Sequence, residues 1–138
     1  MFINVEHIGI AVKDLGSGEA LYEKLLGVAS YKRETVESES VMTSFFQINE
    51  TKIELLQAID TDSPIARFID KKGEGIHHIA FEVNDIGAEM ERLKNEGFVL
   101  LNEKPKIGAD HKLVCFVHPK STYGVLIELC QDIKNVEP

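Results

Sequence analysis

The sequence predicts an α+β fold made of two tandem βαβββ modules that form a cupped mixed sheet around a metal site. Two observations support this fold class. Strand-like and helix-like segments recur in the same order in both halves of the chain, and two runs of sequence match between the halves. Residues 7–16 align without a gap with residues 78–87, and residues 53–57 align with residues 127–131. The matches indicate a duplicated module.

The first module opens with a strand over residues 5–12, in which branched apolar residues alternate with His7, Gly9 and Ala11. Asp14 is a suitable N-cap, and apolar residues then recur at helical spacing as far as Gly27, a typical C-terminal stop. Strand-like runs follow at about residues 28–37, 41–48 and 51–57. The order of these segments is βαβββ.

The second module repeats this order, with a strand over residues 78–83 and a helix from Asp85 to Gly97. Its further strands are predicted at about 98–102, 113–118 and 125–131, and the polar segment 102–112 is predicted to be a loop. Ser63-Pro64 predicts a short helix within a linker over residues 60–75. We therefore expect one domain over residues 1–138, with modules at 1–59 and 76–138.

Composition and charge exclude several classes of protein. The 138 residues carry a formal net charge of −8, which disfavours a nucleic-acid partner. No apolar run approaches the ~18 residues of a membrane span, so no membrane association is expected. The opening residues lack the features of a signal peptide, which leads us to expect a cytoplasmic protein. Cys115 and Cys130 both lie in apolar strand-like runs and are predicted to be reduced core thiols.

Each half supplies one His and one Glu at matched positions. His7 and His78 open matched strands, whereas Glu54 and Glu128 lie in matched Ile-Glu-Leu contexts. Side-chain alternation places all four opposite the apolar faces of their strands. Because a duplicated module brings equivalent residues together near a pseudo-twofold axis, the four predict a His2Glu2 site for one divalent metal ion. Cobalt, manganese, zinc, nickel and magnesium all remain compatible with these ligands.

The remaining histidines and the lysines have weaker signals. His77 points to the sheet face opposite His78, and His111 and His118 are predicted to be structural or solvated. Four lysines occur between residues 104 and 120, where Asp110 is the only acid. This stretch is either a solvated lysine-rich loop or a binding surface for an anionic small molecule. The four lysines are Lys104, Lys106, Lys112 and Lys120.

The strand-borne order His, Glu, His, Glu resembles the vicinal oxygen chelate superfamily, which includes glyoxalase I, extradiol dioxygenases and methylmalonyl-CoA epimerases. Within it, the chain looks most like the methylmalonyl-CoA epimerases. The runs that carry this resemblance are residues 62–66, 75–80, 104–109 and 118–120, the last ahead of residues 124–129. The resemblance implies a glyoxalase-like fold, one divalent metal ion bound by the four residues above, and a homodimer.

The resemblance also implies an activity, the metal-dependent epimerisation of (2R)- and (2S)-methylmalonyl-CoA through a metal-stabilised enolate. It places Glu128 at the metal and beside the α-carbon, which makes Glu128 the expected base. Lys106 and Lys120 are expected to bind the coenzyme A phosphates. Some family members have a second Glu on the third strand of the first module, but residues 41–46 contain no carboxylate. A water, another side chain or Glu54 released from the metal stay open as the second acid or base.

Two other functions share these features. Glyoxalase I, a lactoylglutathione lyase, uses the same metal quartet and also forms an enolate. A metal-free relative that binds a small molecule would have kept the four residues without the ion. An extradiol dioxygenase is disfavoured because a non-haem iron oxygenase site has two His and one carboxylate, whereas this chain offers two carboxylates.

Overall fold

A computed structural model describes residues 1–135. The chain divides into two compact units, the N-terminal unit and the C-terminal unit. The N-terminal unit is His7–His77, and the C-terminal unit is Met1–Glu6 together with His78–Pro138. Strands β1 (Phe2–Ala11) and β5 (Gly75–Val83) each continue from one unit into the other. The single-domain division stays a prediction, and the last three residues of its second module lie outside the described residues.

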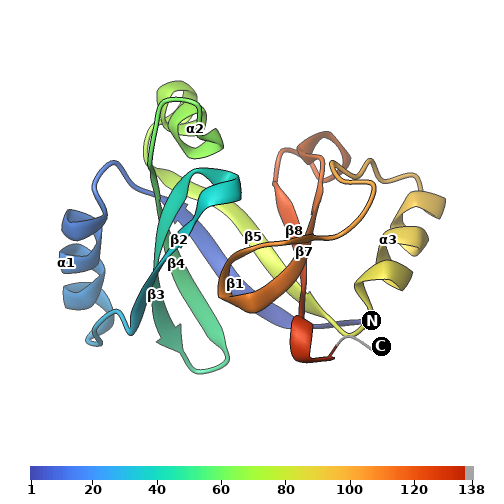
Figure 1. The fold of residues 1–138 in the computed structure, drawn as a ribbon, viewed down its shortest axis with the longest axis horizontal. Helices are drawn as coiled ribbons and strands as arrows, with labels where there is room; N and C mark the ends of the chain where they lie inside the picture. The colour runs from blue at the N-terminus through green and yellow to red at the C-terminus, as the bar shows by residue number, and fades with distance from the viewer. Residues whose placement is uncertain (136–138) are drawn as a thin grey trace. The chain divides into compact units, whose positions relative to one another are not determined.

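The N-terminal unit contains the elements of the predicted first module (Figure 1). After β1 come α1 (Leu15–Leu26), β2 (Lys32–Val36), β3 (Val41–Ile48) and β4 (Thr51–Ala58). The strand order is β2-β3-β4-β1, in which β2, β3 and β4 pair antiparallel and β1 runs parallel to β4. Helix α1 packs on β3 and β4.

Helix α1 begins and ends where the sequence predicts. The Asp14 side chain accepts a hydrogen bond from the Ser17 backbone N–H, and Gly27 closes the helix in the left-handed conformation with φ 75°. The side chain of Gln57 on β4 accepts a bond from the backbone N–H of Leu15, at 2.6 Å. The helix start is therefore tied both to its own N-cap and to the sheet. The core beneath α1 is formed by Val12, Leu15, Phe46 and Leu55.

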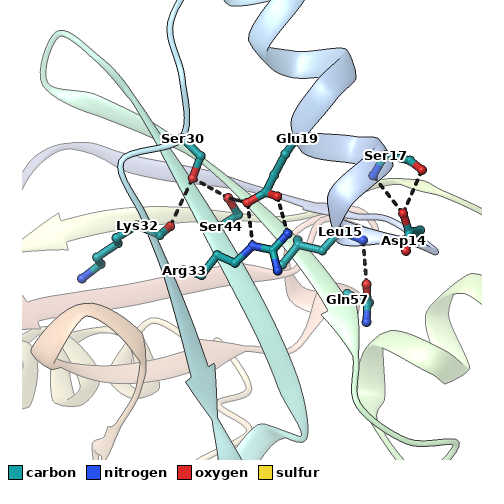
Figure 2. Close-up of polar contacts among 9 residues, drawn as sticks. All are labelled: Asp14, Leu15, Ser17, Glu19, Ser30, Lys32, Arg33, Ser44 and Gln57. Carbon is teal, nitrogen blue, oxygen red and sulfur yellow. Dashed lines mark hydrogen bonds and ion pairs between the residues drawn. The ribbon is translucent and has the colours of Figure 1, made fainter.

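A polar cluster holds the other side of α1 against the β2–β3 hairpin (Figure 2). Glu19 of α1 accepts hydrogen bonds from Arg33 Nε on β2, at 2.9 Å, and from the hydroxyl of Ser44 on β3, at 2.6 Å. The Ser44 hydroxyl also bonds that of Ser30 at 2.6 Å. Ser44 is fully buried, so the Glu19 carboxylate satisfies a hydroxyl that is shielded from water.

Helix α2 (Pro64–Lys72) is the predicted linker helix. The buried Ser63 hydroxyl accepts a bond from the backbone N–H of Ile65, and Gly73 ends the helix. Among residues 1–135, no helix is both long and apolar enough to cross a membrane.

The C-terminal unit repeats the same topology with shorter strands. After β5 come α3 (Ile86–Asn95), β6 (Lys106–Ile107), β7 (Lys112–Val117) and β8 (Ile127–Asp132). Their order is β5-β8-β7-β6, with β5 parallel to β8 and the other pairs antiparallel. Helix α3 packs on β7 and β8. Because each unit mixes helices with parallel and antiparallel strands, the α+β class is confirmed. The core is formed by Val83, Ile86, Met90, Leu93, Cys115, Val117 and Leu129.

One strand prediction and one loop prediction in this unit were wrong. Residues 98–102 form no strand, and one antiparallel bridge joins Leu100 to Val117. The pairing stops there because a side chain replaces a backbone partner. The Phe116 backbone N–H donates to Asn102 Oδ1, at 2.9 Å, whereas in a continued strand pair it would donate to a backbone carbonyl. The predicted loop 102–112 instead contains the short strand β6. In the N-terminal unit the predicted strand 28–37 is shortened to Lys32–Val36.

Candidate active site

The N-terminal unit brings together one predicted His–Glu pair. His7 of β1 and Glu54 of β4 approach with Nε2 and Oε1 3.6 Å apart. The parallel register pairs Gly9 with Glu54, and the antiparallel register pairs Phe45 with Glu54. The carboxylate therefore has a residue without a side chain on one flank and a phenyl ring on the other. Both His7 and Glu54 are buried.

The C-terminal unit contains the equivalent pair. His78 of β5 and Glu128 of β8 approach with Nε2 and Oε1 3.3 Å apart, and both are buried. The register again pairs the carboxylate with a small residue, Ala80, and with a phenylalanine, Phe116. The Phe116 ring meets the His78 ring edge to face, with centroids 6.1 Å apart. The duplication thus extends from the candidate ligand residues to the residues that flank them.

The burial of the four residues limits what they can do. An isolated buried carboxylate is costly, and each Glu here has an imidazole nitrogen as its neighbour. Such a pair is stable either as an ion pair or as two ligands of a metal ion, since neutral imidazole and carboxylate both bind divalent metals. Either state keeps the carboxylate oriented on its sheet face.

The structure separates the two lysines that were predicted to bind substrate. Lys106 of β6 is half-buried, and its Nζ lies 5.7 Å from the centroid of the Phe116 ring. Lys120 is exposed in a short 3-10 helix, Pro119–Ser121, that follows β7. Phe116 connects Lys106 with the His78–Glu128 pair, whereas no described contact connects Lys120 with that pair.

Several neighbours of the site had not been predicted. Phe45 and Phe116 were not singled out, although side-chain alternation along their strands marks the faces they occupy. Gln57 and Gln131 occupy matched positions of the repeat, and this match could have marked them in the sequence. Their side chains accept hydrogen bonds from the first residues of helices α1 and α3. Lys112, predicted only as part of the lysine-rich stretch, is buried, with Nζ 3.6 Å from Asp132 Oδ2.

The other histidines have structural surroundings. His77 packs edge to face on Phe68 of α2, with centroids 4.9 Å apart, and burial lowers its pKa to about 4. His118 Nδ1 accepts a hydrogen bond from the backbone N–H of Lys120, at 3.0 Å.

Comparisons with known proteins extend this picture. Residues 6–116 match the family model of the Glyoxalase/Bleomycin resistance protein/Dioxygenase superfamily. An ethylmalonyl-CoA/methylmalonyl-CoA epimerase of Cereibacter sphaeroides is 43% identical, over 95% of this chain and 99% of the relative. The human mitochondrial methylmalonyl-CoA epimerase is 41% identical, over 92% of this chain and 73% of the relative.

A solved structure is similar to this chain over its whole length. It is a methylmalonyl-CoA epimerase in complex with methylmalonyl-CoA and ammonium, and it superposes with a TM-score of 0.94 at 30% identity, over 100% of both chains. The predicted glyoxalase-like fold is confirmed by this likeness and by the family match. The chain belongs to the Glyoxalase/Bleomycin resistance protein/Dioxygenase superfamily and, within it, to the family of the methylmalonyl-CoA epimerases.

Proposed function

We propose that this chain is a metal-dependent epimerase that interconverts (2R)- and (2S)-methylmalonyl-CoA. Its membership of an epimerase family makes it an enzyme of the racemase and epimerase class. The observation that carries the proposal is the buried Glu128 carboxylate, held 3.3 Å from His78 and flanked by small and aromatic residues. A carboxylate in this position suits proton transfer at a carbon acid.

The proposed metal ligands are His7, Glu54, His78 and Glu128. Two imidazole nitrogens and two carboxylates fit a divalent ion, and the ligand types admit cobalt, manganese, zinc, nickel or magnesium. Support comes from the matched register of the two His–Glu pairs and from the family. When bound, the ion supplies Lewis-acid stabilisation of the negative charge that develops on the substrate oxygens.

Glu128 is the proposed base that removes the α-proton of methylmalonyl-CoA. This proton is acidic because the α-carbon lies between a thioester and a carboxylate. The imidazole of His78 fixes the direction of the Glu128 carboxylate, and Phe116 and Ala80 limit the access of water to it. The proton must return on the opposite face, and a water, another side chain or Glu54 are the candidates for that step.

Proton NMR of methylmalonyl-CoA in deuterated water tests the reaction. The signal of the α-proton should disappear with added cobalt far faster than in the enzyme-free control, and chelation should stop the loss. Ethylmalonyl-CoA, run in parallel, tests whether a longer alkyl group is accepted. If the metal binds in near-stoichiometric amount and no exchange occurs, the epimerase proposal fails, and the glutathione hemithioacetal of methylglyoxal becomes the next substrate to test.

Metal stoichiometry tests the proposed ligand set separately from the reaction. Elemental analysis after dialysis against cobalt should give one ion per chain in the wild type. His7→Ala and His78→Ala should each remove most of that ion, because both residues serve one site. Two independent sites would instead leave about one ion after either substitution, which would contradict the shared site.

We further propose that the enzyme acts in the cytoplasm as a homodimer. The support for the dimer is the family and the general preference of soluble proteins for closed symmetric association. Light scattering coupled to size-exclusion chromatography should give twice the mass of the 15.4 kDa chain. A monomeric mass over a wide range of concentrations would rule out the dimer.

A further inference from the structure

Of the two lysines predicted to bind substrate, Lys106 is half-buried and Lys120 is exposed. This difference suggests that they bind different parts of the substrate. We propose that Lys106 binds the free carboxylate of the acyl group, whereas Lys120 serves the phosphates of coenzyme A. The inference rests on the proposed function and divides the substrate between two subsites. Lys106 then determines specificity for acyl groups that carry a second carboxylate.

Strand register places Lys106 on the sheet face of the proposed base. Lys106 pairs with Val114 across β6 and β7, and Phe116 pairs with Glu128 across β7 and β8. Val114 and Phe116 are two residues apart on one strand, so their side chains share a face. Lys106, Phe116 and Glu128 therefore all lie on the same face of the C-terminal sheet.

One phenyl ring contacts both the lysine and the His–Glu pair. The Lys106 Nζ lies 5.7 Å from the centroid of the Phe116 ring, which is a cation–π distance. The same ring meets His78 at 6.1 Å, and His78 lies 3.3 Å from Glu128. The Lys106 amine therefore lies beside the ring that packs on the partner of Glu128, the proposed base.

Lys112 lies on the same face but does not fit this role. Its Nζ is 3.6 Å from the Asp132 carboxylate, which is its direct partner in the β7–β8 register. Asp132 lies four residues beyond Glu128 on β8, which corresponds to ~13 Å along the strand. The Lys112 amine therefore lies at the far end of β8 from Glu128.

The length of coenzyme A argues against a phosphate at Lys106. The arm between the thioester and the phosphates has about the length of four extended residues, or ~14 Å. An α-carbon at Glu128 consequently puts an extended coenzyme's phosphates well beyond the Phe116 ring. The acyl carboxylate, in contrast, is one bond from the α-carbon. Lys120, which is exposed beyond the end of β7, suits a solvated phosphate.

A truncated substrate separates the two subsites. Methylmalonyl-pantetheine carries the same acyl group as methylmalonyl-CoA and lacks the nucleotide. Lys106→Met should lower kcat/KM for α-proton exchange about tenfold to a hundredfold on both thioesters, since a charge-assisted contact is lost in each. Lys120→Ala should lower it on the CoA thioester alone. Lys104→Met, which alters an exposed lysine two residues from Lys106, should leave both rates unchanged.

Two results would overturn the assignment. One is a Lys106→Met defect that vanishes with the pantetheine thioester, which would place the nucleotide at Lys106. The other is an unchanged kcat/KM on both thioesters. A wild-type enzyme that exchanges neither thioester would instead refute the proposed function, which keeps the two failures distinct.

Ligand binding supplies a second measurement that needs no turnover. Methylmalonyl-CoA and propionyl-CoA differ only in the acyl carboxylate, so calorimetric titration of each isolates that group. We expect the wild type to prefer methylmalonyl-CoA, and Lys106→Met to reduce the preference about tenfold or more while Lys106→Arg retains part of it. Equal preference in the wild type and Lys106→Met would contradict the proposal, provided that circular dichroism shows both to be folded.

Discussion

The side-chain carbonyl of Gln131 accepts a hydrogen bond from the backbone N–H of Ile86 at 2.9 Å, and so ties the last strand of the C-terminal unit to the start of α3. The Gln131 amide also donates to the carbonyl of Asn84 at 3.0 Å. Gln57 makes the equivalent contact with Leu15 in the N-terminal unit. Each Gln follows its candidate ligand Glu by three residues, so one strand presents a candidate ligand on one face and binds a helix on the other.

Replacement of Gln131 by Leu should therefore destabilise the protein. Gln131 is buried, and its loss leaves the Ile86 N–H and the Asn84 carbonyl unsatisfied, at a cost of about 1–3 kcal/mol. Gln57→Leu is the matched variant at a less buried position and should cost less. Urea denaturation measures both, and equal stability of the Gln131→Leu variant and the wild type would refute this role.

Glu128→Gln should abolish most of the α-proton exchange without unfolding the protein. An amide cannot accept the proton, and loss of a general base typically lowers the rate about 10²- to 10⁴-fold. Glu54→Gln alters the equivalent strand position in the other unit and gives the comparison for the loss of a proposed metal ligand. The cobalt content of both variants is measured beside the exchange rate. If the rate falls only in proportion to the lost cobalt, and equally in both variants, Glu128 acts as a metal ligand and not as the base.

His77 should make the stability of the protein sensitive to acid. Burial lowers the pKa of His77 to about 4, from an ordinary value near 6.5, so the folded state disfavours the charged ring. The contribution of His77 to the free energy of unfolding is therefore fully present above pH 6.5. It is lost as the pH falls toward 4, because His77 takes up its proton at a higher pH in the unfolded chain than in the folded protein. The loss is on the order of 2–3 kcal/mol.

His77→Phe keeps an aromatic ring against Phe68 and removes the titration. Urea unfolding at pH 7, 5 and 4 should therefore show a smaller loss of stability for this variant than for the wild type. Parallel curves for the two proteins over that range would show that His77 takes up its proton equally readily in the folded and the unfolded state, and would contradict this prediction.

Glu19→Gln should weaken the attachment of α1 to the β2–β3 hairpin. Hydrogen bonds from Arg33 and then from Ser44 lower the pKa of Glu19. The variant should lose about 1–3 kcal/mol at pH 7. Because the pKa is lowered in the folded state, this contribution is present above the ordinary carboxyl pKa and fades as the pH falls below it.

Thermal unfolding of the Glu19→Gln variant at pH 7 and pH 3 measures this effect. Glu23→Gln, an exposed substitution on the same helix, serves as the control for a lost surface charge. A difference between wild type and Glu19→Gln that is equally large at both pH values would contradict the role of the ionised carboxylate.

Both cysteines should resist thiol reagents in the folded protein. Cys115 and Cys130 are free and fully buried, and burial raises the pKa of Cys115 to about 11 and that of Cys130 as well. Because the thiolate is the reactive form, an aromatic disulfide reagent at pH 8 should react slowly until denaturant is added, and then with two thiols per chain. Fast modification of the folded protein would show that these thiols are accessible.

Much of the fold could be predicted because its signals are local. Asp14, Gly27 and Ser63 sit at helix ends that their own side chains or backbone conformations determine. The alternation around Glu54 and Glu128 likewise predicted the face of each carboxylate. Residues 98–102 could not be predicted, because the Asn102 side chain takes the place of a backbone partner.

The same limit applies to the candidate site. The His–Glu pairs follow from a repeat that is visible in the sequence, and each pair meets within its unit. The contact of Lys106 with Phe116 depends on the register of a two-residue strand, which no local pattern specifies. Sequence therefore identified the lysine as a candidate, and only the strand pairing indicates which part of a substrate it suits.

Strand β1 contributes residues to both units, so the protein cannot be divided into its units by a single cut in the chain. Residues Met1–Glu6 belong to the C-terminal unit, although the rest of that unit begins at His78. A gene fragment that encodes only the second half of the chain would omit these six residues. Fragment complementation would therefore need the first residues to be supplied in trans.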